Sequence, residues 1–343
     1  MSTKNLQILL ASRPNGEPRL KNFDMRESEI PASQPGRMLL RAIYLSLDPY
    51  MRGRMNAGKS YAPPVEIGEI MEGRTIAEVV WSDLAAYKAG DIVFNPSHGW
   101  QIYALSDGKG IQKVDPSVSP PSYALGILGM PGLTAYTGLE NIGRPQAGET
   151  LVVAAASGAV GSVVGQIGRI RNCRVVGIAG GAAKCDYVKG ELGFDECLDR
   201  REPNLAERLR AVCPRGIDVY FENVGGQVFE AVMPLLNNFA RIPVCGLIAH
   251  YNASEPEQRP DRLPLLMQQI LTKRLTLRGF IVGDFASQLP QFLTDMGQWV
   301  REGRIKYKED ITDGLENAPR ELIGLLRGEN FGKKIIRVSE GLS

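Results

Sequence analysis

The stretch LVVAAASGAVGSVVGQIGRI, residues 151–170, decides the fold class of this chain. Its first six residues form the near-continuous apolar run that is typical of a strand covered on both faces. A turn of small residues then leads into a helix. The turn nearly matches the dinucleotide pattern G-x-G-x-x-G, with Ala156 at the first position and Gly158 and Gly161 at the other two. The stretch therefore predicts a strand–turn–helix unit that is either a pyrophosphate loop or a tight packing turn without a ligand.

The phosphate interpretation has a physical basis. The first backbone N–H groups of a helix lack intrahelical acceptors, and together with the helix dipole they favour an anion. We expect Gly158 to let the backbone approach the pyrophosphate and Gly161 to let helix and strand pack closely. Alanine at position 156 is tolerable if that residue keeps a negative φ.

Strands and helices alternate after this unit. The pattern predicts strands over 174–180, 196–199, 216–224, 240–247 and 274–283, and helices over 160–171, 182–192, 204–214, 226–236 and 289–305. Such alternation is the signature of a doubly wound parallel sheet of the Rossmann type. The fold class expected is therefore α/β.

Residues 1–128 read differently. Short apolar runs at 36–47, 74–81 and 91–95 are separated by Gly, Pro and Asp turns, which predicts a barrel-like or partly open β domain. The tail is expected to form a helix, a turn and a strand and to rejoin this domain. We therefore expect residues 1–129 and 304–343 to form one β domain, and residues 130–303 to form the nucleotide-binding domain.

Composition excludes several function classes. The formal net charge is +2, with 40 basic and 38 acidic residues, and no dense Lys/Arg run indicates nucleic-acid binding. The apolar stretch near the N-terminus is too short to be a signal sequence or to span a membrane. The five cysteines are odd in number and form no C-x-x-C pair, so free thiols in a reducing cytoplasm are expected.

The inventory of histidines argues against zinc and against a serine triad. His98 and His250 are the two histidines of the chain, and residues 1–172 contain no cysteine. A Cys/His zinc site in that half is therefore ruled out. No G-x-S-x-G elbow is present, and we expect His98, in NPSHGW, to be a loop residue.

The second strand of the nucleotide unit favours NADPH over NADH. An NAD site places Asp or Glu near the end of this strand to bind the ribose 2′-hydroxyl. Here the strand ends in Gly180 and Gly181, and no acid appears before Asp186. Lys184 is a countercharge for a 2′-phosphate, and Arg200, after the third strand, is a second candidate. For both cations the alternative is a solvated surface side chain.

The chain as a whole resembles the zinc-independent branch of the medium-chain dehydrogenase/reductase superfamily. The resemblance is to the group of prostaglandin reductase, leukotriene B4 dehydrogenase, curcumin reductase and 2-alkenal reductases. It rests on matches that run end to end, above all LSLDPYMRGRM (45–55), GMPGLTAYTGL (129–139) and AASGAVGSVVGQIGRI (155–170). It implies a GroES-like β domain beside the Rossmann domain. It also implies NADPH-dependent reduction of the carbon–carbon double bond of α,β-unsaturated ketones and aldehydes, without metal.

The resemblance also implies site residues. Tyr251 and Tyr50 are the candidates near the reacting atoms, as donors or pocket walls; the alternative for each is a buried aromatic ring with a satisfied hydroxyl. Met130 matches a residue near the nicotinamide, and its alternative is a core methionine. The implied cofactor contacts are Gly158, Ala159, Val160, Gly161, Lys184, Arg200, Asn223, Cys245, Gly246, Leu247, Ile248, Ala249, His250, Tyr251, Phe280, Ile281, Val282, Asn330 and Met130.

One departure from the group concerns Arg200. The group usually has tyrosine at this position, and this chain carries one additional residue in KGEL before it. The contact that the group makes there on the adenine side is therefore in doubt, and Arg200 could strengthen 2′-phosphate binding instead.

Three functions stay open at this point: an enone reductase, a quinone reductase of the same superfamily, and a nucleotide-binding protein without catalysis. We expect a homodimer, because the group pairs the edge strands of two cofactor domains. LTLRGFIV (275–282) is apolar enough to be such an edge.

Overall fold

The computed structural model describes residues 4–253 and 261–340 and divides the chain into two compact units. The first unit comprises residues 1–126 and 309–343, and the second comprises residues 127–308. The chain thus leaves the first unit once and returns to it. No helix within the described residues is long and apolar enough to cross a membrane.

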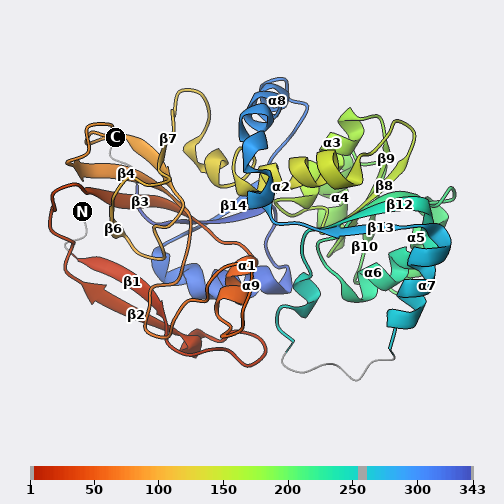
Figure 1. Cartoon of the computed structure of the whole chain (residues 1–343), viewed down its shortest axis with the longest axis horizontal. Coiled ribbons are helices and arrows are strands. Elements are labelled where there is room, and N and C mark those ends of the chain that lie inside the picture. The colour runs from red at the N-terminus through yellow and green to blue at the C-terminus, as the bar shows by residue number, and fades with distance from the viewer. Residues whose placement is uncertain (1–3, 254–260, 341–343) are drawn as a thin grey trace. The chain divides into compact units, whose positions relative to one another are not determined.

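The second unit is built on a six-stranded sheet (Figure 1). Its strands are β8 (Thr150–Ala154), β9 (Arg174–Ala179), β10 (Glu196–Asp199), β11 (Ile217–Phe221), β12 (Leu236–Val244) and β13 (Thr276–Gly279). Every pairing is parallel, and the order is β10-β9-β8-β11-β12-β13. The order reverses between β8 and β11, which confirms the predicted doubly wound sheet.

Helices cover both faces of this sheet. One face carries α5 (Leu205–Val212), α6 (Gly226–Val232) and α7 (Leu263–Lys273), whose apolar residues pack into the main core cluster. On the other face α2 (Met130–Gly138), α3 (Gly161–Ile170) and α8 (Leu289–Arg301) pack together (Figure 1). The helix α4 (Ala182–Gly190) packs against β9 and β10. All five residues of β8 are buried, as expected for a strand with cover on both sides.

Several boundaries in this unit differ from the sequence prediction; for example, the strand expected over 240–247 is Leu236–Val244 and the helix expected over 289–305 ends at Arg301. The strand expected over 274–283 ends at Gly279, and a 3-10 helix occupies Val282–Gln288. The helix expected over 226–236 ends at Val232, and a 3-10 turn that contains Pro234 leads into β12. Proline lacks the N–H that a continuing α-helix would use.

The first unit is predominantly β. The strands β1 (Asn5–Leu10) and β2 (Phe23–Ser28) pair antiparallel. A larger sheet follows the order β14-β15-β3-β4-β5-β7, with β6 also on β3. Its strands are β3 (Met38–Ser46), β4 (Thr75–Ser82), β5 (Ile92–Asn95), β6 (Tyr103–Ser106), β7 (Gln112–Lys113), β14 (Glu309–Asp313) and β15 (Lys333–Arg337). Two helices complete it, α1 (Tyr50–Arg54) and α9 (Ala318–Arg327).

The tail rejoins this β unit as predicted. The strand β15 pairs antiparallel with β3, with Ile335 opposite Ser46 and Ile336 opposite Leu45. Both isoleucines are fully buried. The C-terminal strand therefore completes the sheet of the first unit and brings the GENFGKKII segment next to the end of β3.

Candidate functional site

The loop between β8 and α3 turns at Ala155 rather than at Ala156. Ala155 has φ +52°, whereas Ala156 keeps a negative φ. A left-handed conformation costs a non-glycine residue about 1–2 kcal/mol. The side chain of Ala156 is fully buried, and a Cβ built on Gly177 of β9 would stand 2.8 Å from that of Ala156. Alanine thus fits the first position of the motif because the neighbouring strand carries a glycine opposite it.

Gly161 begins α3, at a point where no side chain fits. A Cβ on Gly161 would overlap the Ala155 carbonyl oxygen and stand 2.8 Å from its carbonyl carbon. At Gly158 the closest atom, the same oxygen, is 3.2 Å away. The helix therefore starts in direct contact with the strand end, with its first N–H groups directed along the helix axis. This cradle fits a pyrophosphate, because the backbone can approach it closely and the dipole favours its charge.

Positive charge gathers beside the end of β9. A Cβ on Gly180 would lie 3.3 Å from the Arg200 Nε, and one on Gly181 would lie 3.3 Å from the Arg201 Nη1. Lys184 is the third residue of α4, which begins directly after Gly181. Arginine and lysine cations at the end of the second strand fit a 2′-phosphate, and that strand itself ends in glycines rather than in an acid.

Asp199 organises this group of cations. Its Oδ1 accepts the N–H of Gly181 at 2.8 Å and the N–H of Arg201 at 2.9 Å. Although burial acts in the opposite direction, the hydrogen bonds of both N–H groups hold the pKa of this carboxyl below its ordinary value. The carboxylate is thus used to join the loop after β9 to the loop after β10. Sequence reasoning missed both Asp199 and Arg201; the adjacent basic pair Arg200–Arg201 was the available signal.

Asn223 lies at the point where the strand order reverses. Its side-chain Nδ2 donates to the Ala154 carbonyl at 2.9 Å, which joins the carboxyl ends of β11 and β8. In open α/β sheets, ligands bind at this switch point. Beside it, the buried carboxyl of Glu222 accepts the N–H groups of Val224 and Gly225. Burial raises the pKa of this carboxyl above its ordinary value, against the effect of those bonds.

The segment 245–251 runs beside the same strand ends. The N–H groups of Cys245 and Gly246 donate to the Glu222 carbonyl at 2.9 and 3.2 Å. Burial raises the pKa of the Cys245 thiol to about 12, so the side chain is a neutral thiol. The Tyr251 hydroxyl lies 3.4 Å from the Leu247 N–H, which donates to it. The structure thus gathers Asn223 and residues 245–251 at one edge of the sheet.

Phe280 and Met130 have different surroundings. The Phe280 ring is buried and packs edge-on against Phe221, with centroids 6.4 Å apart. The ring is thus part of the packing between β11 and the segment after β13, and Ile281 next to it is exposed. Met130 is the first residue of α2 and is half-buried. Its carbonyl accepts the Thr134 hydroxyl at 2.8 Å.

In the first unit, Tyr50 begins the short helix α1. The guanidinium carbons of Arg54 and Arg74 lie 5.7 and 5.5 Å from the centre of its ring. Burial, reinforced by the charge of Asp48, raises the pKa of the Tyr50 phenol well above its usual value. Tyr50 is therefore a neutral phenol at physiological pH and can donate a hydrogen bond to an oxygen that gains charge.

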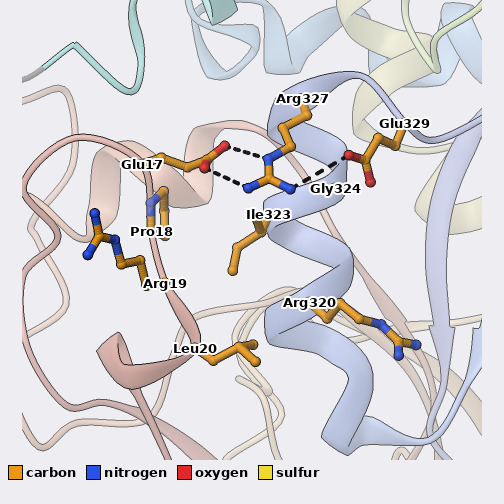
Figure 2. Close-up of a pocket in the computed structure, with 9 residues that line it drawn as sticks. All are labelled: Glu17, Pro18, Arg19, Leu20, Arg320, Ile323, Gly324, Arg327 and Glu329. Atoms are coloured by element: carbon orange, nitrogen blue, oxygen red, sulfur yellow. Dashed lines mark hydrogen bonds and ion pairs between the residues drawn. The ribbon is translucent and has the colours of Figure 1, made fainter.

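Asn330 lies in the loop between α9 and β15, where its Nδ2 donates to the Gly332 carbonyl at 2.8 Å. A small pocket of about 360 Å³ adjoins this loop within the first unit, between residues 17–20 and α9. Figure 2 shows Arg327 bridging Glu17, at 2.8 Å through two bonds, and Glu329, at 3.8 Å. None of the residues expected at the site lines this pocket.

The two histidines lie in separate surroundings. His98 is in a loop, as expected, but it is buried, and burial lowers the pKa of its imidazole to about 4. Its Nδ1 lies 3.4 Å from the Asn95 Nδ2. The His250 ring packs against Gly225. Within residues 4–253 and 261–340, no three His, Cys, Asp or Glu side chains are grouped so that they could hold a metal ion.

Comparisons with known proteins place the chain in a family. Residues 6–114 match a family model described as the N-terminal domain of oxidoreductase, and residues 159–298 match one described as zinc-binding dehydrogenase. The NADPH-dependent curcumin reductase of Escherichia coli (strain K12) is 55% identical over 337 residues, which are 98% of this chain and 97% of that protein. The chain belongs to the prostaglandin reductase group of medium-chain dehydrogenases/reductases.

Two further members of this reductase group support the assignment. Prostaglandin reductase 1 of Bos taurus is 41% identical over 327 residues, 94% of this chain and 95% of that protein. The crystal structure of CurA from Vibrio vulnificus in complex with NADPH is 54% identical, covers 98% of this chain and 99% of that one, and has a TM-score of 0.95. The members of the group share a Rossmann domain and a GroES-like domain, the two expected from the sequence.

Proposed function

We propose that this protein is an NADP-dependent oxidoreductase that reduces the carbon–carbon double bond of α,β-unsaturated ketones and aldehydes. The observation that carries the proposal is the cofactor edge of the second unit. There the cradle at Gly158 and Gly161 and the cations at Gly180–Gly181 lie at the ends of β8 and β9. The substrate class comes from relatives named curcumin reductase, prostaglandin reductase 1 and 2-alkenal reductase.

In this proposal the role of each residue follows the resemblance to the reductase group, and the geometry of the loops after β8 and β9 supports it. Bound NADPH supplies the hydride, which the β-carbon of the enone receives. Gly158, Ala159, Val160 and Gly161 hold the pyrophosphate with their backbone, and Lys184, Arg200 and Arg201 hold the 2′-phosphate. Asn223, residues 245–251, residues 280–282, Met130 and Asn330 form the remaining contacts. The charge that develops on the carbonyl oxygen needs a hydrogen-bond donor rather than a metal.

The test is a substrate panel with NADPH and NADH. Purified protein is mixed with alkenals, alkenones, diaryl dienones and quinones, and cofactor oxidation is followed at 340 nm. We expect turnover of enones with NADPH, much weaker turnover with NADH, and no loss of activity after treatment with a chelator. Quinone turnover without enone turnover would favour a quinone reductase. NADPH binding without any turnover would favour a binding protein.

Tyr50→Phe tests the donor role of Tyr50. We expect kcat to fall about 100- to 1000-fold, the loss that follows from removing one donor to a developing oxyanion. The KM for NADPH should stay within twofold of wild type. Because the pKa of Tyr50 is raised, kcat of wild type should show no alkaline loss below about pH 10, the ordinary phenol value. A kcat unchanged by the substitution would leave Tyr50 as a pocket wall. Tyr251→Phe, measured in the same way, tests the second candidate.

We also propose a homodimer through the β13 edge of the second unit. The strand β13 is the last of its sheet, so one side of it has no partner in the described part of the chain. The preceding helix, α7, packs against β12 and exposes Leu263, Met267 and Leu271 at spacings of four residues, with exposed fractions of 60, 56 and 77%. Its other face, with Leu266 and Ile270, packs into the core. An unpaired strand edge and an exposed apolar stripe are typical of an interface.

Met267→Glu combined with Leu271→Glu is expected to convert the dimer into a monomer, because two charges would have to be buried in the interface. Light scattering on a sizing column gives the mass. Leu20→Glu, at a similarly exposed leucine of the first unit, is the control and should leave the mass of a dimer. A wild-type monomer at micromolar concentration would contradict the proposal.

For the location of the protein we propose the cytoplasm. All five cysteines are free thiols, and four of them are buried, which is the usual state in a reducing compartment.

A further inference from the structure

Lys333 is a buried lysine of the first unit, and both hydrogen bonds of its ammonium reach the segment Leu47–Asp48. It begins β15, and its side chain is 1% exposed. Its ammonium donates to the Leu47 carbonyl at 2.7 Å and to the Asp48 Oδ1 at 2.9 Å. The other carboxylate oxygen of Asp48 accepts the Ser46 hydroxyl. The ammonium therefore holds the end of β3 by both main chain and side chain.

The held segment leads directly to Tyr50. Asp48 is followed by Pro49, the residue before α1, and Tyr50 is the first residue of α1. The Asp48 carbonyl accepts the Met51 N–H at 3.1 Å, inside the first turn of that helix. On the other side, Lys333 follows Asn330 by three residues. One ammonium group thus joins the two segments of the first unit that carry expected site residues, and it joins the DPYMR and GKKII motifs.

Stability alone does not explain such a pair. Moving two charges out of water costs several kcal/mol for each ion, and apolar replacements of buried ion pairs are often neutral or stabilising. What a buried pair with these additional bonds supplies is a fixed geometry, because only one arrangement satisfies every group. The Tyr50 ring needs that precision, because a donor to a developing charge must be placed within a few tenths of an ångström.

We infer that Lys333 is a positioning residue, whose ammonium, through Leu47 and Asp48, sets the place of the Tyr50 hydroxyl for the carbonyl oxygen of the substrate. This inference rests on the proposed function of the protein and deepens it. Lys333 itself touches neither substrate nor cofactor. Its neighbour Lys334 serves a different purpose, because its ammonium pairs with Asp310 at 2.9 Å and with Glu321 at 2.6 Å.

The chain offers a matched control for the test. Arg41 and Glu78 form a second buried ion pair of the same unit, at 2.9 Å, with side chains 9 and 3% exposed. Arg41 lies on β3 seven residues before Asp48, which is roughly 20 Å along a strand. Lys333→Met and Arg41→Met therefore each remove the cation of one buried ion pair, but only the first pair involves the Tyr50 segment. Lys333→Met combined with Asp48→Asn removes the Asp48 charge as well.

We expect Lys333→Met and the double variant to lower kcat for an enone about 10- to 100-fold at a temperature where both are folded, with the KM for NADPH within twofold of wild type. Arg41→Met should lower the melting temperature and leave kcat within twofold. A double variant with the kcat of wild type would overturn the inference. Failure of both Lys333 variants to fold would also overturn it, because the pair would then be a requirement of folding.

A second measurement does not depend on turnover. In protein labelled with 13C at the tyrosine Cζ, the resonance of Tyr50 is assigned by its loss in Tyr50→Phe. We expect Lys333→Met combined with Asp48→Asn to shift or broaden this resonance and Arg41→Met to leave it in place. An unchanged resonance in the double variant would overturn the inference. If the wild-type protein reduced no enone, the proposed function would fail, and the resonance would still report whether Lys333 places Tyr50.

Discussion

Gly161→Ala is expected to lower both the stability of the second unit and its affinity for the cofactor. The added methyl would overlap the Ala155 carbonyl oxygen, which is main chain and cannot rotate away. Either α3 moves from β8 or the loop opens. Forcing one methyl into packed structure costs about 1–3 kcal/mol. The KM for NADPH should rise about 10- to 100-fold, because displaced N–H groups no longer meet the phosphates.

Two control variants separate the loss of stability from the loss of cofactor affinity. A Cβ on Gly190, at the end of α4, has no atom within 4 Å, so Gly190→Ala should leave melting temperature and KM near those of wild type. At Gly158 an added Cβ would lie 3.2 Å from the Ala155 oxygen. We therefore expect Gly158→Ala to raise the KM for NADPH with little change in melting temperature. A Gly161→Ala protein with wild-type stability and KM would contradict the close packing of the loop.

Removal of the cations beside Gly180–Gly181 is the second large effect. We expect Lys184→Ala to raise the KM for NADPH about 10-fold, and the pair Arg200→Met with Arg201→Met to raise it about 10- to 100-fold. A charge-assisted hydrogen bond contributes about 1.5–3 kcal/mol, and 1.4 kcal/mol is tenfold in an equilibrium. The KM for NADH should stay within twofold, because NADH carries no 2′-phosphate. Initial rates with one enone and each of the two cofactors give the KM for NADPH and the KM for NADH of each variant.

Arg210→Met is the control for charge alone, since Arg210 is an exposed arginine in the last turn of α5, at the opposite end of that helix from the loop after β10. It should change neither KM. Equal increases for NADPH and NADH in the variants would mean that these cations stabilise the loop rather than read the 2′-phosphate. Equal kcat/KM values for both cofactors in wild type would reject the assignment of a phosphate site altogether.

Much of the fold followed from local pattern. The apolar run before Ala156 and the repeated alternation of strands and helices after it predicted a parallel sheet. A strand that is buried on both faces has apolar side chains at nearly every position, rather than at every second one. The helix α7 escaped this reasoning. Its apolar residues lie on two faces, one packed in the core and one exposed, so the sequence shows no single helical stripe. The exposed face is accounted for only by the dimer interface that we propose.

The candidate site was also partly visible in the sequence. Two local features, the absence of an acid at the end of β9 and the position of Lys184, pointed to NADPH. The presence of two histidines in the whole chain pointed away from zinc. Arg201 and Asp199 were not visible in this way. The role of Asp199 depends on a hydrogen bond to Gly181, which lies eighteen residues earlier in the chain, and local patterns do not report such contacts.

The sequence by itself determined the alternation of strands and helices, the glycine positions of the phosphate loop and the absence of an acid in the residues that end β9. These are properties of neighbouring residues, and short-range sterics and periodicity control them. The tertiary structure alone decided why Ala156 fits, because Gly177 comes from the next strand. Only the tertiary structure shows that Lys333 binds Asp48, two residues before Tyr50, because these residues are 285 positions apart in the chain. Such pairs depend on how the folded chain brings distant residues together, and no local pattern contains that information.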